Sequence, residues 1–119
     1  MKDNLILDKS MDFAVRIIKL YDYLDKQRKY YDPFKQMLRS GTSIGANVNE
    51  AVNGQSKKDF LTKMYIAFKE ARETEYWLRL LHKTNFIDDK SFESISKDCL
   101  EINKILTTII KTTKKNMEK

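Results

Sequence analysis

Apolar residues recur at steps of three and four through four long stretches of the chain. This spacing is typical of helices that bury one face. No stretch alternates apolar and polar residues for long, so a sheet is not expected. The pattern predicts helices near residues 10–29, 33–52, 57–84 and 89–112. We expect the polar and basic residues 113–119 to form a frayed tail.

Side chains that favour helix starts precede each predicted helix. The capping candidates are Ser10, Asp32, Ser56 and either Asp88 or Asp89. An oxygen at such a position accepts hydrogen bonds from the free N–H groups of the first turn. Pro33 also suits a first helical position, where no N–H partner is needed. Four helices joined by short loops predict an all-α, up-down antiparallel four-helix bundle, with one domain over residues 1–119.

The inward stripes define the expected core. In the first helix the stripe is Phe13, Ile17, Leu20 and Leu24, and Ile18 widens it. The third helix contributes Phe60, Met64, Ala67, Ala71, Thr74 and Leu78. The fourth contributes Phe92, Ile95, Cys99, Ile102, Leu106 and Ile109, the spacing of a coiled-coil-like seam.

Two glycines lie on the inward face of the second predicted helix. Gly41 and Gly45 each cost about 1 kcal/mol relative to alanine in a helix interior. We expect the close approach of a neighbouring helix to compensate for this cost. A phosphate-binding loop is not expected, because no strand precedes the glycines and no Lys-Ser or Lys-Thr follows them.

Two further rows lie beside the core and are candidates for contact with another subunit or a partner. The second helix carries the polar row Ser43, Asn47 and Glu50. The third helix carries the acidic-aromatic stripe Ile66, Glu70, Glu73 and Trp77. Covered carboxylates need a cation or hydrogen bonds, and Arg39 or Arg72 are the expected partners. The alternative is that both rows are solvated.

The net charge of +6 and the sequence pI near 9.3 permit binding to RNA or DNA. The candidate residues are Arg28, Lys29, Lys35, Arg39, Lys57, Lys58, Lys111, Lys114 and Lys115. In an up-down bundle, Lys57 and Lys58 share one end with the C-terminal lysines, and such an end binds phosphates without reading sequence. The alternative is solvated lysines that aid solubility. Tyr30, Tyr31 and Phe34 either stack bases or form a hydrophobic cluster.

The sequence does not favour an enzyme. His82 is the only histidine and Cys99 the only cysteine, so no metal-binding spacing exists, and Cys99 fits a buried core position. No Glu-x-x-His pair of a di-metal bundle is present. We expect no cofactor, no small-molecule substrate and no membrane span. A single cysteine suits the reducing cytoplasm.

Several motifs resemble a known bacterial family, the four-helix-bundle proteins encoded by intervening sequences of 23S ribosomal RNA genes. The motifs are "QMLRSGTSIGANVNEA", "SKKDF" and "IAFKEARETEYWL". The matching positions are Gln36, Arg39, Ser43, Ile44, Asn47, Glu50, Ser56, Lys57, Lys58, Phe60, Ala67, Glu73 and Trp77. Ala51 and Glu70 depart from the residues that many relatives carry.

This resemblance implies an up-down bundle that assembles as a ring-like homopentamer. The family's role is poorly defined, and its ribosomal-protein label comes from gene location. Similar bundles are accessory proteins of diversity-generating retroelements, where they bind nucleic acid and a reverse transcriptase. The leading hypothesis is therefore a non-enzymatic, oligomeric protein that binds RNA or DNA through backbone electrostatics. The alternative is a scaffold that docks a protein on the acidic-aromatic stripe.

Overall fold

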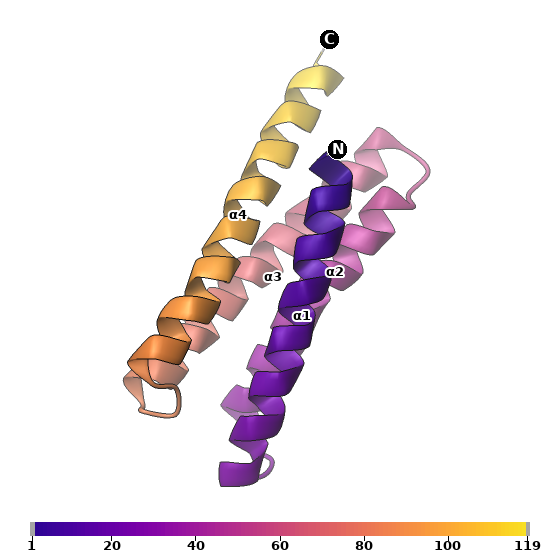
Figure 1. Cartoon of the computed structure of the whole chain (residues 1–119). Coiled ribbons are helices and arrows are strands. Elements are labelled where there is room, and N and C mark those ends of the chain that lie inside the picture. The colour runs from indigo at the N-terminus through magenta and orange to yellow at the C-terminus, as the bar shows by residue number, and fades with distance from the viewer. Residues whose placement is uncertain (1, 119) are drawn as a thin grey trace.

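The chain folds into an antiparallel bundle of four helices, here described from a computed structural model (Figure 1). The helices are α1 (Lys2–Gln27), α2 (Asp32–Val52), α3 (Lys57–Lys83) and α4 (Asp89–Met117). The structure describes residues 2–118, and the side chains of residues 5–118. Each helix packs against the next, and α4 closes the bundle against α1. The prediction of an all-α, up-down four-helix bundle is confirmed.

The first helix begins at Lys2, so the predicted start near residue 10 is wrong. Ile6 is fully buried and extends the inward stripe of Phe13 and Ile17 by two turns toward the N-terminus. Ser10 is not a cap. It is buried inside α1, and its hydroxyl donates to the carbonyl oxygen of Leu7 at 3.2 Å.

The predicted frayed tail from residue 113 is also wrong, because α4 continues to Met117. Ile109 and Ile110 are buried, which holds the last turns against the bundle. The Thr113 hydroxyl donates to the carbonyl oxygen of Ile109 at 2.7 Å, and the Lys114 ammonium lies over the ring of Tyr65.

Two of the predicted caps are confirmed. The Ser56 hydroxyl accepts a hydrogen bond from the Asp59 N–H at 3.0 Å, and the Asp88 carboxylate accepts one from the Ser91 N–H at 2.7 Å. The predicted cap at Asp32 is wrong, because Asp32 is already the first residue of α2 and Tyr31 precedes it without a side-chain cap.

All four helices contribute to one apolar core. Its largest fully buried side chains are Phe13, Phe34, Ile6, Ile17, Leu24, Met37, Ile44, Met64, Leu78, Leu81, Ile102 and Leu106. Cys99 lies in this core, as predicted, with its thiol 3.5 Å from the carbonyl oxygen of Ala71. Burial raises the pKa of Cys99 to about 12, so the thiol stays protonated at neutral pH. Within residues 2–118, no helix is long and apolar enough to cross a membrane.

The two inward glycines of α2 lie against α1, which confirms the predicted close approach. A Cβ atom at Gly41 would lie 2.8 Å from Cγ1 and 2.9 Å from Cγ2 of Ile17. A Cβ atom at Gly45 would lie 3.4 Å from the carbonyl and hydroxyl oxygens of Ser10. The first separation is a clash and the second is an ordinary contact, so only Gly41 is required for space.

These two positions therefore predict opposite effects of the same substitution. Gly41→Ala should lower the free energy of unfolding by about 1–3 kcal/mol, because Ile17 must move within a packed core. Gly45→Ala should leave it unchanged or raise it by up to about 1 kcal/mol through better helix propensity. Urea unfolding followed by circular dichroism measures both. Equal losses in the two variants would contradict the assigned contact.

The cap of α4 predicts a pH-dependent contribution to stability. Hydrogen bonds from the backbone and side chain of Ser91 lower the pKa of Asp88 below its ordinary value of 3.8, and Lys90 and His82 add to the effect. A carboxyl whose pKa is lower in the folded state stabilises above its unfolded pKa, and this contribution is lost as pH falls through the folded pKa.

Asp88→Asn keeps a good capping residue but removes the titration. We expect the melting temperature of the variant to lie below that of the wild type at neutral pH. The two should converge as the pH falls through the lowered pKa of Asp88 in the folded protein. A difference that stays constant from neutral to acidic pH would contradict the role of the Asp88 charge.

Candidate nucleic-acid interface

Five lysines lie at one end of the bundle, which we call the basic end. They are Lys57, Lys58, Lys111, Lys114 and Lys115, and all are exposed. The antiparallel course of α3 and α4 brings the start of one helix and the end of the other to the same end of the molecule (Figure 1). The helical extension of α4 fixes the direction of Lys114 and Lys115, which lie in the segment predicted to fray.

Lys114 is held by an aromatic partner. Its ammonium lies 5.8 Å from the centre of the Tyr65 ring on α3, a cation–π arrangement. A hydrogen bond with the Tyr65 side chain raises the pKa of Lys114, and the nearby Glu118 adds to this. Lys114 therefore remains charged at neutral pH, and Tyr65 joins α4 to α3 at the basic end.

The remaining basic candidates do not join this end. Arg28 and Lys29 follow α1 at the opposite end of a bundle whose long dimension is 51 Å. The guanidinium of Arg28 stacks 3.9 Å from the ring centre of Tyr31. Lys35 is exposed in the first turns of α2, near the same opposite end.

The aromatic residues beside Arg28 form a hydrophobic cluster, so base stacking on Tyr31 and Phe34 is not supported. Phe34 is fully buried, and its ring centre lies 5.0 Å from that of Tyr31 and 5.0 Å from that of Phe86. Tyr30 is exposed and adopts a left-handed backbone conformation with φ of 61°.

Arg39 is paired with carboxylates of the third helix. Its guanidinium donates to Glu70 at 3.1 Å and also to Glu73, which confirms one of the two expected pairings. The Glu70 side chain is 18% exposed, so this cation compensates a largely covered charge. With two carboxylates beside it, Arg39 is a weak candidate for binding phosphate.

The polar row of α2 finds its hydrogen-bond partners within the chain. The Ser43 hydroxyl donates to the Arg39 carbonyl oxygen at 2.6 Å. The Asn47 amide donates to the Ser43 carbonyl oxygen at 2.8 Å. Glu50 pairs with Lys63 on α3 at 3.0 Å. These groups therefore do not need another subunit to be satisfied.

The acidic-aromatic stripe of α3 contains one polar group without a hydrogen-bond partner in the described chain. The indole N–H of Trp77 is buried and has no hydrogen-bond partner within the described residues. The Tyr76 ring packs edge-on against Trp77, with ring centres 5.0 Å apart. Tyr76 is itself exposed, so α3 presents an aromatic ring at the surface next to the buried, unpaired indole N–H. Ile66, about three turns earlier on α3, is also exposed.

An exposed apolar row on α1 was missed by the sequence analysis. Met11, Val15 and Ile18 are exposed at helical spacing, with Ile18 at 46%. The assignment of Ile18 to the core stripe is wrong. These residues follow one another at steps of four and three, so their helical spacing is visible in the sequence. Spacing alone does not distinguish this exposed row from the adjacent inward stripe of α1.

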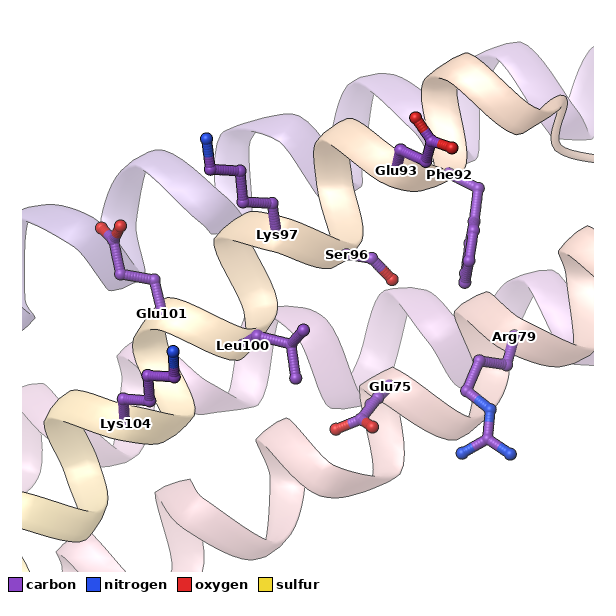
Figure 2. Close-up of a pocket in the computed structure, with 9 residues that line it drawn as sticks. All are labelled: Glu75, Arg79, Phe92, Glu93, Ser96, Lys97, Leu100, Glu101 and Lys104. Carbon is purple, nitrogen blue, oxygen red and sulfur yellow. The ribbon is translucent and has the colours of Figure 1, made fainter.

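A groove between α3 and α4 was also missed (Figure 2). It encloses about 620 Å³, and Phe92, Ser96 and Leu100 point from α4 toward α3. Glu75 and Arg79 lie across from them. A second hollow of about 580 Å³ shares Glu75 and Leu100 with the first. No local sequence pattern marks such a groove, because its walls come from two different helices.

His82 has a structural role at the α3–α4 loop. Its ring stacks on Phe92 with centres 4.1 Å apart, and its Nε2 lies 2.7 Å from an Asp89 carboxylate oxygen. These contacts join the end of α3 to the start of α4. Over residues 2–118, no three His, Cys, Asp or Glu side chains gather as metal ligands would.

The four antiparallel helices and the exposed lysines at one end define a small all-α bundle protein with a basic end. The model of the 23S rRNA-intervening sequence protein family matches residues 2–108, and the chain belongs to this family. A solved structure of a protein of unknown function from the S23 ribosomal protein family of Bacteroides thetaiotaomicron is similar, with 56% identity and a TM-score of 0.90. The match covers 93% of this chain and 99% of that one. No curated protein matches the chain.

Proposed function

We propose that this protein is a non-enzymatic, oligomeric bundle of the cytoplasm that binds RNA or DNA through phosphates at its basic end. The observation that carries the proposal is the grouping of five exposed lysines on the antiparallel ends of α3 and α4. Lysine ammonium groups that neutralise phosphates release bound counterions, so affinity falls steeply with salt. Contacts of this kind position a nucleic acid without reading its sequence.

Two charge-matched double variants test the proposal. Lys57→Ala with Lys58→Ala removes two charges from the basic end, whereas Lys29→Ala with Lys35→Ala removes two from the opposite end. The first pair should weaken binding and reduce the slope of log affinity against log salt by about 1.8 for a DNA duplex. The second pair should change little.

Fluorescence anisotropy with a structured RNA and a DNA duplex, over about 50 to 200 mM salt, measures both effects. Absence of binding to either probe at the lowest salt would contradict the proposed function. Equal losses in the two double variants would contradict its assignment to the basic end.

The proposal includes assembly into a homo-oligomer, a homopentamer by resemblance to the family. The exposed apolar row of α1 supports this, because burying Met11, Val15 and Ile18 against another subunit would remove apolar surface from water. A ring of subunits would also multiply the charge of the basic end. The polar row of α2 remains a second candidate contact, tested by Asn47→Leu.

Ile18→Glu should dissociate the oligomer and leave the helix content intact, because a charge cannot be buried without a partner. Leu100→Glu is the matched control, since Leu100 is 48% exposed and Ile18 is 46% exposed. Light scattering gives the mass in solution, and circular dichroism gives the helix content. An unchanged oligomeric mass for Ile18→Glu would show that this row is not the contact.

A second candidate function is a scaffold that docks a protein on the acidic-aromatic stripe. The unpaired indole N–H of Trp77 beside the exposed Tyr76 ring favours it. Such a complex should survive high salt and be lost in Trp77→Ala. Binding through the basic end has the opposite salt dependence.

A further inference from the structure

Lysines recur at every seventh position along the outer side of α4. They are Lys90, Lys97, Lys104 and Lys111, and all are exposed. Seven residues make nearly two helical turns, so these side chains leave the helix in similar directions, about 10.5 Å apart along its axis. The row continues into Lys114 and Lys115 and so joins the basic end.

The facing side of α3 is also cationic. Lys58, Lys69, Arg72 and Arg79 are exposed there. None of these four, and none of the four lysines in the α4 row, forms an ion pair within the described chain. The ion pairs present use the cations Lys9, Arg16, Arg39, Lys63 and His82. Positive charge is therefore left uncompensated along both rims of the α3–α4 groove.

Three carboxylates lie in the groove, and they are placed unevenly. They are Glu75, Glu93 and Glu101. Glu101 is paired with Lys9 of α1. Glu93 lies near the α3–α4 loop, away from the basic end. The half of the groove nearer the basic end is lined by Arg72 and Lys104, and its lining includes one carboxylate, Glu75.

This half of the groove has an apolar floor beside a polar group without a partner. Its lining includes Phe68, Leu100 and Asn103. Asn103 is only 8% exposed, and neither its amide nitrogen nor its amide oxygen has a hydrogen-bond partner in the described residues. Buried amides are normally paired, and leaving both atoms unpaired destabilises the fold. Both atoms are shielded in this conformation, so a ligand edge with an adjacent donor and acceptor would satisfy them once the Asn103 side chain turns into the hollow.

We propose that a single-stranded polynucleotide runs from the basic end along the α3–α4 groove and places a base in the hollow formed by Phe68, Leu100 and Asn103. This rests on the proposed function and extends it from phosphate contact at one end to base contact along one face. A base has two apolar faces and an edge of donors and acceptors, which suit the floor and the amide. A duplex keeps its base faces stacked inside and would leave the hollow unused.

Four probes of equal length separate these contributions in the full-length protein: an RNA strand, the DNA strand of the same sequence, an abasic DNA strand and a DNA duplex. Anisotropy at one fixed salt concentration gives each affinity. The DNA strand should bind at least about tenfold more tightly than the abasic strand, because stacking of bases adds to phosphate contact. The RNA strand tests whether the ribose hydroxyl contributes.

The ratio of affinities for the DNA and abasic strands isolates the hollow from the lysines. Leu100→Glu should bring this ratio close to one. Lys111→Ala should lower the affinity for both strands by the same factor and leave the ratio unchanged. Asn103→Leu should also lower the ratio while raising the melting temperature, because it removes an unpaired buried amide. A structural role alone would not combine a gain in stability with a loss of base-dependent affinity.

Each outcome decides between the two proposals. Two results would contradict base contact in the groove but agree with phosphate binding at the basic end. One is salt-dependent binding with equal affinity for the abasic and base-containing strands, and the other is tighter binding to the duplex. Displacement of the strand by polyglutamate at equal charge concentration would show that the face accepts any polyanion, and would also overturn base contact. No binding of any probe at low salt would overturn both proposals.

Discussion

The close packing of α2 against both of its neighbours is the constraint on which the bundle depends. On one side, the absence of a side chain at Gly41 admits Ile17 of α1. On the other side, the buried hydroxyls of Ser40 and Thr74 lie 2.9 Å apart and join α2 to α3. Small residues at these points let the helices approach closely, and a larger side chain would force them apart.

The opposite side of the bundle is held differently. α1 and α4 make the sparsest contact of the four adjacent helix pairs. The pairs Lys9–Glu101 and Arg16–Asp98 connect them near the surface. Exposed ion pairs contribute little to stability, so α4 depends mainly on its seam with α3, where Cys99 meets Ala71. The outer face of that seam is the one that carries the uncompensated lysines.

Much of the fold follows from periodicity and capping, because both are local. The inward stripe of α4 and the caps at Ser56 and Asp88 were readable from the sequence for this reason.

Ser10 misled the prediction because a small polar residue is as useful for close helix packing as for capping. The tail was predicted to fray because its own residues are polar. The burial of Ile109 and Ile110 just before it keeps the end of α4 helical and packed on the bundle. The pairing of Arg39 with Glu70 was partly foreseen, since a covered carboxylate demands a cation. The groove between α3 and α4 and the unpaired amide of Asn103 appear only once the two helices pack together, so no local pattern in the sequence marks them.

The central claim is that polynucleotide contacts gather on the α3–α4 side and its basic end. Lysine footprinting by mass spectrometry, with and without a single-stranded oligonucleotide, tests this location directly. We predict protection from acylation at Lys58, Lys104, Lys111 and Lys114. The lysines of the α1–α2 side, Lys19, Lys29 and Lys35, should remain as reactive as in the free protein. Protection of Lys29 and Lys35 instead, or equal protection on both sides, would contradict the account.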